Sequence, residues 1–198
     1  RVVYVSTGGA AYGDTDVVPT PEDHPAHATS PYGVSKVAAE RYLDLWCRST
    51  GGRGVVLRPA NVFGDGDPER HLLALANSMI SGAFRFVGNG RAMVNYVYAG
   101  DVASACLVAA ERARPGETYI VSDPCPLRGF VTAMADELGI PAPAKSIPAW
   151  QAYPAALVME IAGSILRRRL PLTRNKIRAF SSLTVYSPAK IRTELGFQ

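Results

Sequence analysis

Residues 30–36 read SPYGVSK, and this stretch decides the interpretation of the fold. The Ser30 hydroxyl can accept a hydrogen bond from a first-turn N–H, and Pro31 suits the first helical position, so the stretch opens a helix. Apolar residues then recur at helical spacing as far as Trp46, and Gly51 follows the run. The sequence therefore predicts a helix that begins at residue 31 and ends near residue 50.

Strand-like segments lie on both sides of this helix. Residues 1–6 (RVVYVS) and residues 55–57 (VVL) are apolar and rich in valine. The order strand, helix, strand predicts a parallel sheet with crossover helices. Residues 58–67 are expected to leave the second strand as a loop. Because the chain opens directly within a core strand, we expect that an upstream piece of the protein is absent.

The rest of the chain continues the alternation of helices and strands. Apolar spacing predicts helices near residues 72–80, 101–113, 127–138 and 188–195, and short strands at 84–87, 95–98 and 118–121. Asp101 is expected to cap the second of these helices.

Composition and charge narrow the classes of protein. With 198 residues, of which 47% are hydrophobic and 19% charged, the chain can bury a core and is not disordered. A net charge of +4 is modest, and we expect no nucleic-acid partner, because such binders concentrate positive charge on one element. The basic stretch 161–193 contains no Asp or Glu and is interpreted as a solvated face.

Cysteine usage and hydropathy indicate the compartment. Cys47, Cys106 and Cys125 show no metal-ligand spacing, and we expect no metal site. Free thiols, the lack of a signal peptide and the lack of a long apolar run favour a cytoplasmic protein.

Tyr32 and Lys36 are the residues that carry chemistry. They stand four apart at the start of the helix, so both project from one face. The ammonium of Lys36 and the positive end of the helix dipole favour the phenolate of Tyr32, which makes it a usable proton donor or acceptor. The alternative is an exposed tyrosine beside a solvated lysine. Ser6 and Thr7 follow the first strand, and hydroxyls at that end of a parallel sheet lie where ligands bind.

Four blocks in this order resemble the extended short-chain dehydrogenases, the superfamily of nucleotide-sugar epimerases and 3β-hydroxysteroid dehydrogenases. They are STGGAAYG (6–13), SPYGVSK (30–36), LRPANVFGDGD (57–67) and NYVYAGDVASA (95–105). The resemblance implies an α/β fold, the C-terminal part of a doubly wound Rossmann-type sheet with a smaller α/β substrate-binding domain. Residues 1–66 would be half of the dinucleotide-binding domain. Residues 67–198 would be mainly the substrate-binding domain, with 95–122 returning to the sheet.

The same resemblance implies roles for individual residues. Tyr32 would be the catalytic acid/base, Lys36 would hold the nicotinamide ribose, and Thr7, or Ser6 beside it, would hydrogen-bond the substrate oxygen. Gly8 stands where the family often carries the catalytic Ser or Thr, so the hydroxyl role passes to Thr7, and Gly8 lies beside the substrate. The segment that would pass beside the nicotinamide consists of Pro59, Ala60, Asn61 and Val62, with Asn61 reaching the substrate.

The cofactor implied is NAD or NADP. The glycine-rich pyrophosphate turn of the superfamily, and the residue that selects between the two dinucleotides, are not found in the chain. Gly8-Gly9 follows a strand, but the next residues read as Tyr-Gly and a polar loop rather than a helix, so we do not interpret it as a phosphate loop.

The branch of the family is indicated by Val94 and by the tail. Nucleotide-sugar enzymes usually carry at the position of Val94 an Arg that holds the diphosphate, and valine cannot pair with phosphate. The resemblance therefore implies that Val94 lies near the substrate. Residues 171–198 instead resemble the 3β-hydroxysteroid dehydrogenase branch. The resemblance thus implies hydride transfer between nicotinamide and a secondary alcohol or ketone, sterol-like or otherwise apolar. A nucleotide-sugar epimerase or dehydratase, and a non-catalytic NAD(P)-binding relative, are the alternatives.

Residues 149–169 form a mostly apolar stretch that ends in three arginines. The stretch is interpreted as an ordinary core-facing helix, an apolar substrate entrance, or a helix in peripheral contact with a membrane. Pro154 is expected only near its start. The partners expected are therefore a small-molecule substrate, a membrane surface through 149–169 and, from the family, a second copy in a homodimer.

Overall fold

The protein is represented by a computed structural model that describes residues 1–13, 15–66, 71–165, 177 and 181–197. The chain forms two compact units. The first contains Arg1–Asp67, Asn95–Pro124 and Thr184–Gln198, and the second contains Pro68–Val94 and Cys125–Leu183. The segment 95–124 and the C-terminal segment therefore share a unit with the opening strand.

The first unit is built on a parallel sheet of three strands. These are β1 (Val2–Val5), β2 (Gly54–Pro59) and β6 (Thr118–Val121), in the order β1-β2-β6. All six residues of β2 are buried, as expected for the central strand of a sheet covered on both faces. The prediction that the first sixty residues form a strand, a helix and a second strand, in that order, is confirmed.

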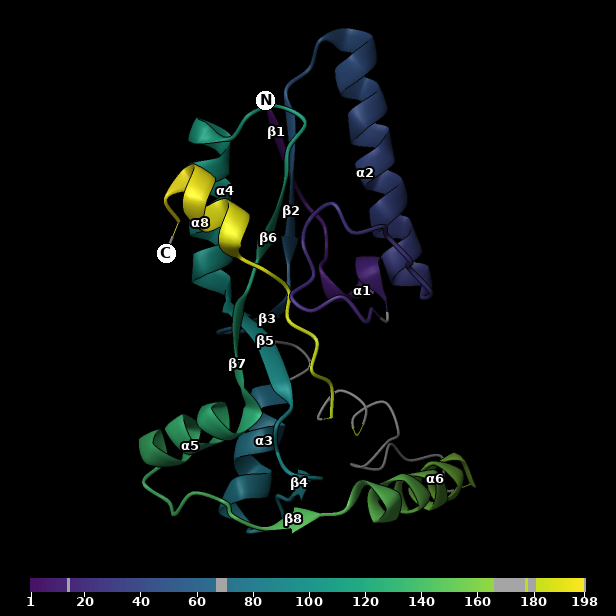
Figure 1. Ribbon diagram of the computed structural model, residues 1–198, viewed down its shortest axis with the longest axis vertical. Coiled ribbons are helices and arrows are strands. Elements are labelled where there is room, and N and C mark those ends of the chain that lie inside the picture. The colour runs from purple at the N-terminus through teal and green to yellow at the C-terminus, as the bar shows by residue number, and fades with distance from the viewer. Residues whose placement is uncertain (14, 67–70, 166–176, 178–180, 198) are drawn as a thin grey trace. The chain divides into compact units, whose positions relative to one another are not determined.

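Helices cover both faces of this sheet (Figure 1). The helix α2 (Pro31–Thr50) lies on one face, and α4 (Ala99–Arg112) and α8 (Ala189–Leu195) lie on the other. The apolar core of the second face consists of Val55, Leu57, Val97, Val102, Ala105, Ala109, Ala113, Tyr119, Val121, Ile191 and Leu195. A parallel sheet with helices on both faces is the doubly wound architecture that the sequence predicted.

The ends of α2 form as the sequence predicts. The Ser30 hydroxyl accepts a hydrogen bond from the Gly33 N–H at 3.0 Å, and Pro31 is the first helical residue. Gly51 follows the helix with φ 70°, a left-handed conformation in which glycine is favoured. These local signals are sufficient to set both ends of the helix.

Three local predictions in the first unit are wrong. The segment 58–67 is not wholly a loop: β2 continues to Pro59, and β3 (Asn61–Phe63) joins a second sheet in the order β3-β5-β7, with β5 (Met93–Tyr98) and β7 (Asp123–Pro126). A four-residue helix, α1 (Gly9–Tyr12), follows β1. Finally, Asp101 is not the cap of α4, because that helix begins at Ala99 and Asp101 lies within its first turn.

The described residues of the second unit form three helices and a two-stranded parallel sheet. The helices are α3 (His71–Ile80), α5 (Leu127–Glu137) and α6 (Ala149–Ile165), and the strands are β4 (Phe86–Val87) and β8 (Ser146–Ile147). Pro154 lies inside α6 rather than at its start. Among the described residues, no helix is both long and apolar enough to cross a bilayer.

Candidate active site

The carboxyl ends of the three parallel strands bring several of the predicted site residues together at one edge of the sheet. The Ser6 N–H donates to the Leu57 carbonyl and the Gly8 N–H to the Pro59 carbonyl, both at 2.7 Å. The Ala60 N–H donates to the carbonyl of Val121 at 2.9 Å. These bonds extend the ladder beyond the regular strands, so Ser6, Thr7 and Gly8 run beside Pro59 and Ala60. In an open α/β sheet this edge is where ligands bind.

Lys36 connects α2 to the same edge. Its ammonium donates to the main-chain carbonyl of Val5 at 3.1 Å, one residue before Ser6. The Nζ atom also lies 5.3 Å from the centroid of the Tyr4 ring and 5.8 Å from that of Tyr32. The helix therefore presents Lys36 to the end of β1, with Tyr32 one turn earlier. Tyr32 is 56% exposed, so its ring is accessible to a ligand.

The two candidate hydroxyls lie in different surroundings. Ser6 is 3% exposed, and among the described residues its Oγ has no hydrogen-bond partner. Thr7 is half-buried. Because a group that binds substrate must be reachable, Thr7 is more accessible to a ligand than Ser6. Asn61 and Val62, on β3, are exposed.

The turn after β1 is not built to hold a phosphate. The helix that follows, α1, has only four residues, which is too short to set up an appreciable dipole. The Gly8 N–H is already donated to Pro59. A Cβ on Gly8 would lie 3.3 Å from that same carbonyl oxygen. The close approach of these two backbone segments therefore explains why a glycine stands here, and no bound ligand is needed to explain it.

Sequence reasoning assigned no role to Arg58, which lies in a buried polar network. Its Nε and Nη2 donate to the two carboxylate oxygens of Glu40 on α2, at 3.0 and 2.7 Å. Its Nη1 donates to the Tyr12 hydroxyl at 2.8 Å and to the Glu22 carbonyl at 3.1 Å. Burial opposes the charge of Arg58, yet the hydrogen bonds with Glu40 and the neighbouring charges raise its pKa. The feature of the sequence that could have indicated this network is the position of Glu40, four residues after Lys36 and so on the same side of the helix.

Tyr12 is a buried neutral phenol. Burial raises its pKa to about 12, although Arg58 acts in the opposite direction. Its ring stacks on that of Tyr186, with centroids 5.9 Å apart. Tyr12 is therefore a structural tyrosine, in contrast to the exposed Tyr32.

Val94, which was expected near the substrate, lies in β5 and is 7% exposed. The next residue, Asn95, is also buried and holds a distant part of the chain. Its Nδ2 donates to the Thr184 carbonyl at 2.8 Å, and its Oδ1 accepts from the Tyr186 N–H at 3.0 Å. Asn95 is thus a structural residue that connects β5 to the C-terminal segment.

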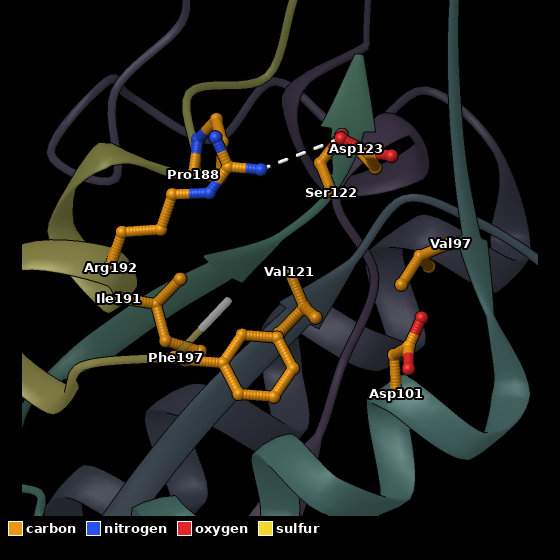
Figure 2. Close-up of a pocket in the computed structure, with 9 residues that line it drawn as sticks. All are labelled: Val97, Asp101, Val121, Ser122, Asp123, Pro188, Ile191, Arg192 and Phe197. Carbon is orange, nitrogen blue, oxygen red and sulfur yellow. Dashed lines mark hydrogen bonds and ion pairs between the residues drawn. The ribbon is translucent and has the colours of Figure 1, made fainter.

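A separate cavity of about 130 Å³ lies where β6 ends, beside the first turns of α4 and α8 (Figure 2). Val97, Val121, Ile191 and Phe197 give it an apolar wall, and Asp101, Ser122, Asp123, Pro188 and Arg192 complete the lining. The Arg192 guanidinium pairs with Asp123 at 3.4 Å. None of the residues predicted for the active site lines this cavity.

Comparison with known families is consistent with this arrangement. The profile of the NAD dependent epimerase/dehydratase family matches residues 1–122, which contain β1, α2, β2 and β6. The chain belongs to this family. The resemblance stated from four sequence blocks is thereby confirmed.

Relatives with different activities match the chain. A 4-hydroxy-2-methyl-3-oxo-4-farnesyl-3,4-dihydroquinoline-1-oxide ketoreductase of Stigmatella aurantiaca is 30% identical over 203 residues, which is 100% of this chain and 60% of the relative. A UDP-glucose 4-epimerase of Mycolicibacterium smegmatis is 32% identical over 148 residues, 71% of this chain and 47% of the relative. The chain thus spans roughly half of the length of these relatives.

The fold is shared with solved enzymes. The UDP-glucose 4-epimerase of Thermotoga maritima, solved with UDP-glucose, superposes with a TM-score of 0.65 and 26% identity. The superposition covers 99% of this chain and 57% of that structure.

Proposed function

We propose that the protein to which this chain belongs transfers hydride between NAD(P) and a secondary alcohol or ketone, with Tyr32 as acid/base. The observation that carries the proposal is the position of Lys36, whose ammonium is bound to the Val5 carbonyl and lies 5.8 Å from the Tyr32 ring. A proton-transferring phenol, a cation and the hydroxyl of Thr7 would then act at one edge of the sheet.

The residues present fit the nicotinamide end of the cofactor. Lys36 donates one ammonium hydrogen to Val5, and an ammonium has three, so hydrogens remain for the hydroxyls of the ribose. The Ala60 N–H and the Pro59 carbonyl are paired within the sheet, so these residues would offer mainly apolar atoms to a nicotinamide ring. Such a ring, when bound, supplies the hydride chemistry.

The chain's own residues would handle the proton and the substrate oxygen. Thr7 donates a hydrogen bond to that oxygen and orients it. Tyr32 gives up or takes its phenolic proton at the same oxygen. The ammonium of Lys36 and the N-terminal end of α2 both favour the phenolate that forms when the proton leaves.

A ketone or alcohol of apolar character is the substrate class we favour. The ketoreductase relative aligns with the whole chain, and the buried valine at position 94 offers no cation to a diphosphate. A nucleotide-sugar epimerase is the second candidate, and the epimerase relative and the UDP-glucose-bound structure favour it. A non-catalytic relative is the third, and an intact Tyr32 and Lys36 argue against it.

The test is turnover by the protein at its natural length. We expect apolar ketones to be reduced with oxidation of NADH or NADPH, and UDP-glucose to be left unchanged. Tyr32→Phe should lower kcat by about 10²- to 10⁴-fold, as expected for the loss of an acid/base group, without affecting folding. Tyr42→Phe, on the same helix and 75% exposed, is the control. Epimerisation of UDP-glucose without ketone reduction would favour the second candidate, and full activity of Tyr32→Phe the third.

We also propose that α6 lies against a membrane surface. Trp150, Tyr153 and Leu157 are 74, 41 and 42% exposed at helical spacing, while Ala152 and Ala156 pack with Ile177. An apolar stripe followed in the sequence by three arginines suits an interface with anionic lipid. The fraction of protein that sediments with phosphatidylserine vesicles should be lower for Trp150→Ser than for the wild-type protein, and unchanged for Trp46→Ser. Equal binding of both variants would contradict the proposal.

We propose that the protein forms a homodimer through exposed apolar residues of α2, including Tyr42 and Leu45. Sedimentation equilibrium should show a dimer for the wild-type protein and a monomer for Leu45→Glu. A monomeric wild-type protein would contradict the proposal.

A further inference from the structure

We infer that the buried ion pair between Glu40 and Arg58 is a positioning device that fixes the rotation of α2, so that Tyr32 and Lys36 face the carboxyl end of β1. Its importance for catalysis rests on the function proposed above. The geometric claim concerns the helix and the sheet and can be tested separately.

The first argument is the spacing along α2. Tyr32, Lys36 and Glu40 are separated by four residues each, so they occupy successive turns on one side of the helix, with a drift of about 40° per step. Lys36 reaches the Val5 carbonyl on β1, and Glu40 reaches Arg58 on β2. The side of α2 that carries the predicted catalytic pair is therefore attached to the sheet one turn further along.

The second argument is the geometry of the pair. The guanidinium binds both carboxylate oxygens, at 3.0 and 2.7 Å, and each side chain is only 10% exposed. A planar fork on a carboxylate restricts orientation as well as distance, which a point charge does not. Arg58 belongs to the central, fully buried strand β2. The bidentate ion pair therefore ties the rotation of α2 to the most constrained part of the sheet.

The third argument is that the same guanidinium holds the chain that leads into α2. Arg58 donates to the Tyr12 hydroxyl at the end of α1 and to the Glu22 carbonyl in the loop between α1 and α2. The Glu22 carboxylate accepts in turn from the Ile120 N–H on β6 at 3.0 Å. The helix, its preceding loop and the strands β2 and β6 are thus connected through the side chains of Arg58 and Glu22.

Stability alone does not account for such a pair. Well-packed apolar side chains of similar volume often replace a buried ion pair without loss of stability. On the same helix, Asp44 and Arg48 form a pair of the same chemical type, at 3.0 Å, with side chains 54 and 76% exposed. Among the described residues, the hydrogen bonds and ion pairs of Asp44 and Arg48 stay within α2, so this pair provides the matched control.

The experiment compares two double variants of the protein at its natural length: Glu40→Leu with Arg58→Met, and Asp44→Leu with Arg48→Met. We expect the first to keep its folded state but to lose about 10-fold or more in kcat, since small misplacements of catalytic groups have effects of this size. Its KM for the dinucleotide should rise, because Lys36 is also proposed to bind the ribose hydroxyls. The pH dependence of kcat should shift, because the ammonium of Lys36 is no longer held at the Val5 carbonyl. The control should resemble the wild type in all three.

A second readout does not depend on turnover. Competitive acetylation of lysines, followed by mass spectrometry, should show higher reactivity of Lys36 in the first variant, relative to the exposed Lys145, because its bond to Val5 is lost. If that double variant does not fold, Glu40→Gln, which keeps the shape of the side chain, takes its place.

Unchanged Lys36 reactivity and an unchanged pH dependence in the variants at position 40 would overturn the inference. A wild-type protein without hydride transfer would overturn the proposed function instead, and the acetylation result would still decide whether the pair orients α2.

Discussion

Gly33 on α2 lies directly against the main-chain carbonyl of Ala10 on α1, so closely that a Cβ on Gly33 would overlap that oxygen. The contact brings α1 onto the first turn of α2, next to Tyr32. Glycine is required here for space rather than for backbone conformation, since Gly33 is an ordinary helical residue.

Replacing Gly33 tests this contact. We expect Gly33→Ala to lower the free energy of unfolding by about 1–3 kcal/mol, because a methyl group in a closely packed site forces the backbone to shift. Gly129→Ala is the control: Gly129 is also helical, and a Cβ there meets nothing within 4 Å. It should stabilise α5 by about 0.5–1 kcal/mol through helix propensity. Denaturant unfolding measures both, and equal effects would contradict the packing argument.

The buried phenol of Tyr12 should make the free energy of unfolding fall in alkali. Burial raises its pKa from 10.0 to about 12 in the folded protein. The folded state therefore holds the phenolic proton more tightly than the unfolded state, so the stabilisation is complete below about pH 10 and is lost as the pH rises towards 12. Tyr12→Phe should remove this contribution, of order 2 kcal/mol, from the decline. The free energy of unfolding, measured at several alkaline pH values, tests this; an identical decline in both proteins would contradict it.

The ion pair of Glu117 with Lys190 should make the free energy of unfolding depend on pH in acid. A hydrogen bond from the Lys190 ammonium, at 2.7 Å, lowers the pKa of Glu117 below its usual 4.5. A carboxylate whose pKa is lowered on folding stabilises the protein above its unfolded pKa, and that stabilisation is lost as the pH falls through the folded pKa. Lys190→Met should therefore flatten the decline in stability below pH 4.5. Arg192→Met, which removes an exposed pair with Asp123, should leave the decline as in the wild type.

Asn95 predicts a cost in stability without a direct role in chemistry. Asn95→Ala removes one bond to the Thr184 carbonyl and one to the Tyr186 N–H. With both groups in a buried region, we expect a loss of about 1–3 kcal/mol in the free energy of unfolding. Asn89→Ala, at an exposed turn, should change it by less than about 0.5 kcal/mol. Thermal unfolding distinguishes the two.

The α2 helix could be predicted to the residue because its signals are local. Ser30, Pro31 and Gly51 act on backbone groups within a turn of themselves, and no distant partner is needed. By contrast, β3 has only three residues and exists through its pairing with β5, more than thirty positions along the chain. No local pattern announces such a strand, because its hydrogen bonds are supplied by a partner distant in sequence.

Among the candidate site residues, the chain order was enough to predict Thr7 and Lys36 near one edge, since the helix that follows a parallel strand begins at the edge where that strand ends. It was not enough to separate Ser6 from Thr7. They are neighbours with similar side chains, and their difference is burial, which depends on everything packed around them.

The sequence by itself determined the type and order of the elements around α2, the parallel sheet and the family, because these depend on residue types at short, fixed spacings. Only the tertiary structure decided that Glu40 and Arg58 meet, that Tyr12 is neutral and buried, and that Lys36 binds the Val5 carbonyl. Those contacts join residues 18 to 46 positions apart, and their geometry follows from how α2 packs on the sheet rather than from any pattern along the chain.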